Sequence, residues 1–353
     1  AVVHAPFGIA ATVPRRGPRN YGYRTVPQAE LDGRQGYQPR GRGVGGSSLI
    51  NAMVYIRGQP EDYDGWAAAG CDGWSWSDVL PYFKRAENNE RGGDDHHGVG
   101  GPLNVADPRD PSPFSDLLIK ASAKAGFPLN ADFNGPRQEG IGLYQVFQKG
   151  GERWNAARAY LEGKPRPNLT VIADCAVLRV VFDGRRAAGV VVRADEVETI
   201  IRARRQVVLS AGAYGSPQLL MCSGVGPAQH LKDVGVEVVL DSPDVGGNLQ
   251  DHLDYTVARL AKSRSLIGFT PLFVWQFFRA ISRYKKERRG LMTSNISEAG
   301  GFIKSCPDLD RPDLQLHFCI SVVDDHGRKR HLGRGFSVHV CGLRPKSRGT
   351  VRL

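Results

Sequence analysis

The chain has 353 residues, of which 41% are hydrophobic and 24% charged, so its composition is that of a folded globular protein with room for two domains rather than a disordered or fibrous chain. Lysine and arginine total 47 against 36 aspartates and glutamates, which gives a formal net charge of +11. No apolar run approaches the roughly 20 residues that a membrane-spanning helix needs.

The positive charge is scattered along the chain and rich in arginine, and only residues 285–289 form a block. That block stands where cations favour the C-terminus of a helix. No nucleic-acid motif accompanies it, so we expect no nucleic-acid partner. Salt-sensitive retention on DNA or RNA would show the opposite.

Six cysteines occur without a CxxC pair and without metal-ligand spacing, so we expect reduced, mostly buried thiols and no metal site. The N-terminal residues have neither the basic nor the apolar region of a signal peptide. These features favour a cytoplasmic protein, with a peripheral position at the inner membrane left open.

Residues 1–40 are rich in Pro, Gly and Arg and carry no helical pattern, so we predict an irregular surface segment with one strand near residues 20–26. A glycine-rich stretch then runs from Gly41 to Gly58. We predict a helix entered from a glycine turn, with Ser47 or Ser48 as its N-cap. Free N–H groups at such a terminus attract phosphate, although a tight packing turn is the alternative.

The same stretch fits Gly-x-Gly-x-x-Gly at Gly41, Gly43 and Gly46. A nicotinamide-type dinucleotide fold needs a buried strand before that motif, and residues 36–40 are not one. We therefore predict no such fold at this position.

Between residues 77 and 161 the pattern predicts three helices. The first begins at Ser77, the second covers residues 114–125 and ends at Gly126, and the third covers residues 155–161. Residues 92–113 are predicted to be a loop. His96 and His97 lie in it, and adjacent histidines without a third ligand indicate a solvated pair rather than a metal site.

From residue 169 the pattern changes to strands, at 169–173, 177–182 and 189–193, with an Asp183-Gly184 hairpin turn. The apolar run 206–210 is typical of a buried parallel strand. It leads into a helix predicted to have Ser216 as N-cap, Pro217 at its first position and Gly224 past its end. This strand, turn and helix predict a second binding site for phosphate or for a flavin. The alternative is an ordinary connection between a strand and a helix.

The last third of the chain begins with a predicted helix over residues 272–289, whose apolar stripe of Phe273, Phe277 and Ile281 faces a core. Alternating residues then predict half-buried antiparallel strands near 314–320 and 336–340. The polar face of these strands carries Gln315, His317 and His339. Residues 323–335 between them are a candidate mobile loop at a substrate entrance.

Two long stretches carry a family resemblance. Residues 41–64 resemble the first signature of the glucose–methanol–choline (GMC) flavoprotein oxidoreductases, and residues 212–226 resemble the second, closest to the choline and alcohol dehydrogenase branch. The resemblance implies an α/β fold, with α+β character in the second domain: an incomplete FAD-binding Rossmann-like domain and an antiparallel-sheet substrate domain. The implied segments are 1–105 (FAD-binding part and flavin lid), 106–160 (substrate domain), 161–252 (FAD-binding part) and 253–353 (substrate sheet).

The resemblance also implies hydride transfer from an alcohol, such as choline or another primary alcohol, to FAD. The cofactor-contacting residues that it implies are Val44, Gly45, Gly46, Ser47, Ser48, Asn51, Ala52, Met53, Val54, Val177, Ala211, Gly212, Asn248 and His252. Ile50 occupies the position where some members attach FAD through a histidine, so we expect non-covalent FAD. Glu298 matches a glutamate of the choline branch and is a candidate substrate contact or a surface strand residue.

The family's catalytic histidine is expected beyond Leu353, and its first phosphate-binding segment before residue 1. His252, His317 and His339 stand outside the family's catalytic motif. We therefore expect this chain to be the middle portion of a larger enzyme, inactive and weak in FAD binding by itself. An oxidase or lyase of the same family, or a non-catalytic binding module, remains an alternative. Neither the electron acceptor nor the oligomeric state follows from the sequence.

Overall fold

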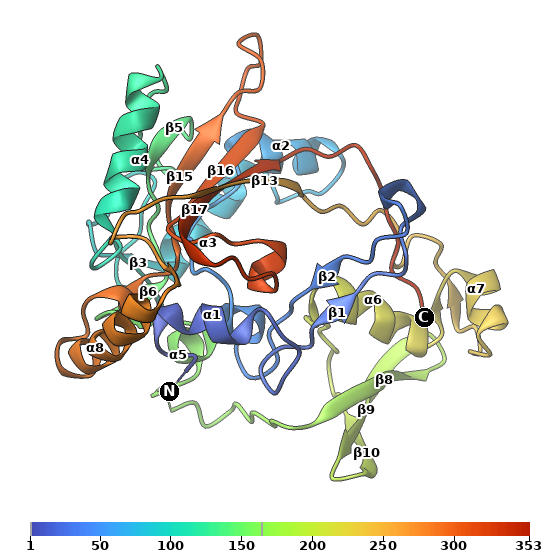
Figure 1. The fold of residues 1–353 in the computed structure, drawn as a ribbon. Coiled ribbons are helices and arrows are strands. Elements are labelled where there is room, and N and C mark those ends of the chain that lie inside the picture. Colours follow the sequence, from blue (N-terminus) through green and yellow to red (C-terminus); the bar gives the residue numbers. More distant parts are fainter. Residues whose placement is uncertain (1, 164) are drawn as a thin grey trace. The chain divides into compact units, whose positions relative to one another are not determined.

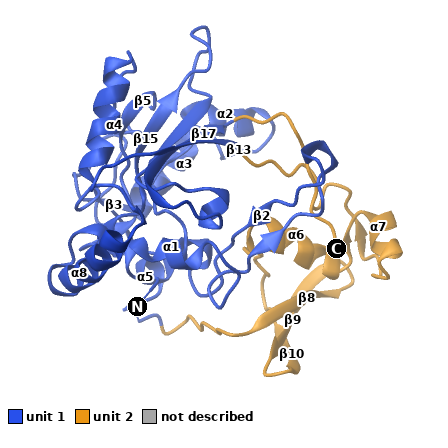
Figure 2. Cartoon of the chain, in the orientation of Figure 1, with its two compact units in different colours: residues 1–166, 253–343 blue, residues 167–252, 344–353 orange. Residues whose placement is uncertain are grey.

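The computed structural model describes residues 2–163 and 165–353. The chain forms two compact units, shown in Figure 2, and each is described by itself. Unit 1 contains residues 1–166 and 253–343, and unit 2 contains residues 167–252 and 344–353. The assignment of the four predicted segments to cofactor and substrate domains stays a prediction.

The centre of unit 1 is a six-stranded sheet, in which β14 adds to the path β13-β17-β16-β15-β5 (Figure 1). All of its pairings are antiparallel, which confirms the predicted antiparallel sheet. Its strands are β5 (Gly140–Leu143), β13 (Leu253–Leu260), β14 (Gly268–Phe269), β15 (Ser297–Ile303), β16 (Leu314–Cys319) and β17 (Gly333–Gly342).

The sheet follows from the alternation in its sequence. Leu316, Phe318, Val338 and Val340 lie on one face, because successive side chains of a strand point to opposite sides. Helix α4 (Pro113–Lys124) packs Leu118 and Ile119 onto the same cluster. Ser112 caps this helix by accepting the N–H of Phe114, and Gly126 follows it with φ 90°, as predicted.

Helix α3 (Trp76–Ala86) begins earlier than predicted. Its N-cap is Ser75 rather than Ser77, because the Ser75 hydroxyl accepts the N–H of Asp78 while the Asp78 carboxylate accepts the N–H of Ser75. The predicted loop 92–113 is also interrupted, since β4 (Leu103–Val105) pairs in parallel with β3 (Glu87–Asn89).

Unit 1 carries further short elements around these. They are α1 (Ile9–Thr12), β1 (Tyr23–Arg24), β2 (Tyr37–Gln38), α2 (Pro60–Ala68), β6 (Gln148–Lys149), β7 (Glu152–Arg153), α5 (Ala156–Tyr160) and α8 (Pro271–Glu287), with 3-10 turns at Pro6–Gly8, Ala29–Leu31, Gly46–Leu49, Leu291–Thr293 and Asp325–Gly327. On α8, Phe273 and Phe277 pack onto a core that contains Phe7 and Ile320, which confirms the predicted apolar stripe.

Unit 2 contains a three-stranded antiparallel sheet in the order β10-β9-β8, the helices α6 and α7, and the parallel pair β11–β12. Residues Asp183 and Arg186 pair across the turn at Gly184, so the predicted hairpin is confirmed. The elements are β8 (Ala176–Asp183), β9 (Arg186–Ala194), β10 (Val197–Arg202), α6 (Gly212–Cys222), β11 (Val225–Gly226), α7 (Ala228–Asp233) and β12 (Leu240–Asp241).

Three predictions for unit 2 were wrong. Residues 169–173 form no strand, and neither do residues 206–210, which pair with no described strand and leave Val208 72% exposed. Helix α6 begins at Gly212 with Ala211 at its N-cap, so Ser216 lies inside it. The Ser216 hydroxyl accepts the N–H of Ala211 and thereby fixes the helix start one turn earlier than predicted.

Across the described parts of the chain, no helix combines the length and apolar character that crossing a membrane requires. Those same parts hold no grouping of three or more His, Cys, Asp or Glu side chains suited to a metal ion. The six cysteines are free.

Candidate functional site

The glycine-rich stretch forms one 3-10 turn, Gly46–Leu49, rather than the predicted helix. Ile50 leaves the helical region with φ −130°, and Met53 has φ 60°, so the chain turns away before a second helical turn forms. Gly45, with φ 104°, takes the N-cap position that we predicted for Ser47 or Ser48. Both serines lie within the turn.

Two glycines of this turn serve different purposes. A Cβ on Gly45 would lie 3.2 Å from the backbone nitrogen of Ala157, so Gly45 allows α5 to pack closely against the turn. Gly46 has φ 57° and a Cβ there would meet nothing within 4 Å. The backbone at Gly46 therefore borders open space, which a ligand can approach without meeting a side chain.

The two serine hydroxyls close the turn on itself. Ser47 Oγ accepts the N–H of Gly41 at 3.1 Å. Ser48 Oγ donates to the carbonyl oxygen of Gly45 at 2.5 Å and accepts the N–H of Ala156 at 3.0 Å. The Ser48 hydroxyl thus ties the turn to the start of α5, and its contact with a cofactor stays a prediction.

Arg153 lies against the same turn and is 1% exposed. Its Nη1 donates to the carbonyl oxygens of Ser48 and Asn51 at 3.1 and 2.7 Å and to Asn51 Oδ1 at 2.9 Å. Its Nε has no partner within the described chain, and no carboxylate there pairs with the guanidinium. Burial lowers the pKa of Arg153 to about 10. The turn thus has a buried positive charge without a counter-ion beside it.

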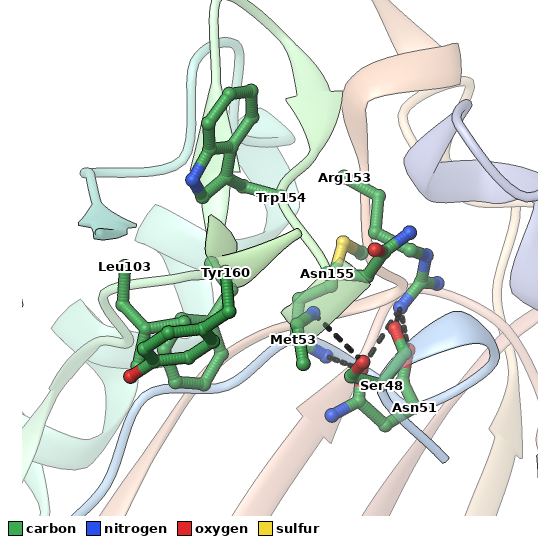
Figure 3. Close-up of a pocket in the computed structure, with 10 residues that line it drawn as sticks. Ser48, Asn51, Met53, Leu103, Arg153, Trp154, Asn155 and Tyr160 are labelled. Carbon is green, nitrogen blue, oxygen red and sulfur yellow. Dashed lines mark hydrogen bonds between the residues drawn. The ribbon is translucent and has the colours of Figure 1, made fainter. Parts of the chain in front are cut away.

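A pocket of about 200 Å³ opens between the turn and α5 (Figure 3). Its lining combines polar groups of the turn with aromatic and aliphatic walls: Ser48, Asn51, Met53, Leu103, Phe147, Arg153, Trp154, Asn155, Ala156 and Tyr160. Trp154 is anchored by a hydrogen bond from Nε1 to the carbonyl oxygen of Pro102 at 2.8 Å. A ring-sized part of a larger ligand fits this volume.

The sequence prediction missed most of this lining. Arg153 and Trp154 directly precede the N-cap Asn155, whose side chain accepts the N–H of Arg158. The only sequence signal for these lining residues was an arginine and a tryptophan before a capped helix. Residues at such positions are usually exposed, so this signal did not indicate a pocket. The burial of Arg153 depends on contacts with residues about one hundred positions away, such as Ser48, and Trp154 is held by Pro102.

The predicted cofactor residues fall in both units. In unit 1, Met53 is buried, Val44 is exposed, Val54 forms a bridge to Val146, and the carbonyl oxygen of Ala52 accepts a hydrogen bond from Asn295. In unit 2, Val177 lies in β8, Ala211 and Gly212 begin α6, Asn248 has φ 54°, and His252 is exposed. Their joint contact with one cofactor stays a prediction.

Glu298 is not a surface residue: it lies in β15, is 1% exposed, and is not among the residues that line this pocket. Its carboxylate accepts the N–H of Ser112 and the Ser115 hydroxyl, both at 2.7 Å, and the Ser294 hydroxyl at 2.6 Å. Burial raises the pKa of Glu298, and these three donors oppose that rise. The carboxylate therefore binds the start of α4, at its N-cap Ser112 and at Ser115, from strand β15.

His97 is also not the solvated residue that we predicted, since it is 5% exposed. Its Nε2 lies 2.9 Å from Asp132 and its Nδ1 lies 3.0 Å from Glu87. The hydrogen bond to Asp132, and then that to Glu87, raise the pKa of His97 to about 9. Arg57 donates to Glu87 at 2.6 Å, so two cations share this buried carboxylate.

His339 lies on the polar face of the central sheet. Its Nδ1 is 2.7 Å from Asp254 Oδ2, and its Nε2 is 3.2 Å from the Ser337 hydroxyl. Burial opposes the charge on His339, but the hydrogen bond to Asp254 outweighs it and raises the pKa to about 10. His339 is therefore a hydrogen-bond donor at neutral pH.

Several solved structures resemble this chain over nearly its whole length. Pyridoxine 4-oxidase from Mesorbium loti aligns with a TM-score of 0.84 and 30% identity, over 99% of this chain and 65% of that one. A formate oxidase aligns with a TM-score of 0.86 or 0.87 at 24% identity, which shows the fold alone. A family model described as GMC oxidoreductase matches residues 7–254, and the chain belongs to that family of flavoproteins.

Curated relatives agree with this membership. An "Alcohol dehydrogenase [acceptor]" of Pseudomonas putida is 44% identical over the whole chain, and an "Oxygen-dependent choline dehydrogenase" of Rhizobium johnstonii is 41% identical over 95% of it. The chain spans 64% and 61% of the lengths of these two relatives.

Proposed function

We propose that the whole protein oxidises a primary alcohol to the aldehyde with FAD as hydride acceptor. The observation that carries this is the open glycine turn at Gly46, which stands beside an aromatic pocket and an uncompensated buried arginine in a chain of the GMC family. Its similarity to an alcohol dehydrogenase adds support.

The residues present fit a flavin nucleotide. The backbone at Gly46 would approach the diphosphate, since no Cβ blocks it there. The positive charge of Arg153 would offset an anionic group, because no described carboxylate does so. Met53, Phe147 and Tyr160 would supply the apolar contacts that a flat ring needs.

The attachment would be non-covalent. Ile50 is buried, and its hydrocarbon side chain has no nucleophilic atom that could bond to the ring. The remaining residues would hold the cofactor through packing and hydrogen bonds alone, so FAD would dissociate when the protein unfolds.

FAD held by these residues would supply a hydride acceptor for the carbinol carbon, and the hydroxyl proton would have to pass to a base. Among the described histidines we assign this base to none. His339 is paired with Asp254 and, with a pKa of about 10, carries its proton at neutral pH, so it is suited to donating a hydrogen bond rather than to accepting a proton.

The substrate class that we favour is an uncharged alcohol rather than choline. Glu298, which we considered for binding a cationic substrate, has its carboxylate committed to Ser112, Ser115 and Ser294. A quaternary ammonium group would therefore find no free carboxylate at Glu298.

The proposal is tested by titrating the purified whole protein, freed of flavin, with FAD while following flavin fluorescence, and by acid-precipitating the complex. Saturable binding, with all flavin released to the supernatant, is expected. In the whole protein, dye reduction by a straight-chain primary alcohol should exceed that by choline. Absence of saturable FAD binding overturns the cofactor assignment, and preference for choline overturns the substrate class alone.

A further inference from the structure

Helix α8 presents apolar side chains to solvent as well as to the core. Its inward stripe packs on the core through Phe273 and Phe277, but four large apolar residues on its first two turns are all at least 47% exposed: Leu272, Val274, Trp275 and Phe278. Figure 2 shows α8 at the periphery of unit 1. An exposed apolar group of this size on one helix marks a surface that binds something.

The exposed apolar surface continues beyond the helix. Phe269, in the strand that immediately precedes α8, is exposed, and it forms a bridge with Leu332, which is 85% exposed. Together with the four residues of α8, these two side chains form what we call the α8 patch. It combines two segments that are sixty residues apart in sequence.

Basic side chains border the α8 patch. Arg279 lies over the Trp275 ring at 4.7 Å and Arg330 over the Phe269 ring at 5.4 Å. Lys285 and Lys286 are exposed on the later turns of α8. None of these four cations forms an ion pair with a described residue, whereas Arg283, Arg288 and Arg289 do.

Along α8 the exposed apolar side chains come first and the basic side chains follow. Apolar residues occupy the exposed face near the N-terminus, and one to three turns later the same face carries Arg279, Lys285 and Lys286. The helix is about 25 Å long at 1.5 Å per residue, so its ends can lie at different depths. Aromatic residues enter a lipid interface while lysine and arginine stay at its anionic headgroups.

We propose that the α8 patch docks the protein on an anionic lipid surface. Trp275, Phe278 and Leu332 enter the interface, and the four free cations contact the phosphates. Charge complementarity favours this occupant, since an apolar protein partner would leave these cations without a counter-charge. The proposal concerns a surface outside the FAD pocket and stands independently of the proposed reaction.

The test is co-sedimentation of the full chain with phosphatidylcholine vesicles that contain or lack phosphatidylglycerol. We expect binding only to the anionic vesicles, weakened as salt is raised. The double variant Trp275→Ser/Phe278→Ser and the double variant Lys285→Glu/Lys286→Glu should each weaken binding by about tenfold or more. Circular dichroism of each variant confirms that it folds.

Matched controls exist in the same unit. Trp74→Ser/Tyr82→Ser removes two comparably exposed aromatic residues, and Lys120→Glu/Lys124→Glu makes the same charge change on α4. Both controls should bind like the wild type. Brominated phospholipids should quench the fluorescence of the wild type and of Trp74→Phe, and the quenching should fall in Trp275→Phe.

Three results would overturn the proposal. One is failure of the wild type to bind anionic vesicles, and another is equal loss of binding in the α8 and control variants. The third is concentration-dependent self-association that the α8 variants abolish while vesicle binding is unchanged, which would assign the patch to a second copy of the chain.

Discussion

Arg153 and Asn51 are joined twice through one nitrogen: Nη1 of Arg153 lies 2.7 Å from the carbonyl oxygen and 2.9 Å from the side-chain oxygen of Asn51. The Asn51 side chain also accepts the N–H of Met53 at 3.2 Å. One buried guanidinium thus fixes the backbone direction on both sides of Asn51. The conformation of the glycine turn depends on a residue one hundred positions later in the chain.

Replacing Arg153 should therefore destabilise the fold. We expect Arg153→Met to lower the free energy of unfolding by about 3 kcal/mol, because three acceptors on Ser48 and Asn51 lose the buried guanidinium that donates to them. The stability of Arg153→Lys should lie between those of the wild type and Arg153→Met, since a single ammonium group reaches fewer of these acceptors. Urea denaturation followed by tryptophan fluorescence measures this. The control is Arg91→Met, which removes an exposed ion pair with Asp107 and should lower the free energy of unfolding by about 1 kcal/mol or less. An equal loss in Arg91→Met and Arg153→Met would contradict the stabilising role of Arg153.

The two glycines of the turn should separate folding from cofactor binding. Gly46→Ala places a methyl group at φ 57° in open space, so it should cost about 1 kcal/mol of stability and weaken FAD binding about tenfold. Gly184→Ala, at φ 57° and equally unobstructed, should cost the same stability without affecting FAD. Gly45→Ala should cost more stability than either, since its methyl group would crowd Ala157. Thermal unfolding and FAD titration give both readouts, and equal FAD affinity in the two alanine variants at φ 57° would contradict the open-turn assignment.

Because of His97, the free energy of unfolding should fall as the pH rises from neutral into the alkaline range. Its folded pKa of about 9 exceeds the ordinary histidine pKa of 6.5, so its contribution is complete below pH 6.5 and is lost as pH rises through about 9. This rise in pKa corresponds to about 3 kcal/mol. The pKa values of Glu87 and Asp132 are lowered, so these two carboxylates contribute stability that is lost as the pH falls through the acidic range.

The His97→Gln variant should therefore lose part of the fall in stability between pH 6.5 and 9. Urea midpoints measured across that range would show a steeper slope in the wild type than in the variant, which keeps the slope that His339 contributes. His331→Gln removes an exposed histidine beside Asp324 and should keep the wild-type slope. A wild type that is already flat over this range would contradict the buried imidazolium.

For Glu298 we expect that its negative charge lowers the stability of the fold, whereas the positive charge of His97 raises it. Because burial raises its folded pKa, the folded state binds the proton more tightly, and stability falls as pH rises above the ordinary carboxyl range. Glu298→Gln keeps the shape without the charge, so it should change stability by about 1 kcal/mol or less at pH 7. Glu298→Ala should cost about 2–4 kcal/mol, because Ser112, Ser115 and Ser294 lose their acceptor. Similar losses in both variants would point to a role of the charge itself.

Local signals in the sequence predicted the elements whose causes are local. The hairpin at Gly184, the cap and end of α4, and the apolar stripe of α8 follow from residues within a few positions of one another. The alternation in β16 and β17 predicted the antiparallel sheet and its polar face. The glycine turn was also located correctly as a feature of the chain, and family membership confirms the signatures that contain it.

The interior of the site was decided by tertiary contacts. Ser48 bonds to Ala156, Arg153 to Asn51, and Glu298 to Ser112, all more than one hundred residues apart. His97 is buried because Glu87 and Asp132 meet around it, and no periodicity of the 92–113 segment indicates that meeting. An apolar run such as 206–210 predicts burial only if partner strands pair with it, and within the described chain none does. Sequence patterns determine which backbone conformations are favourable, whereas the burial and charge state of a polar side chain depend on which distant groups surround it.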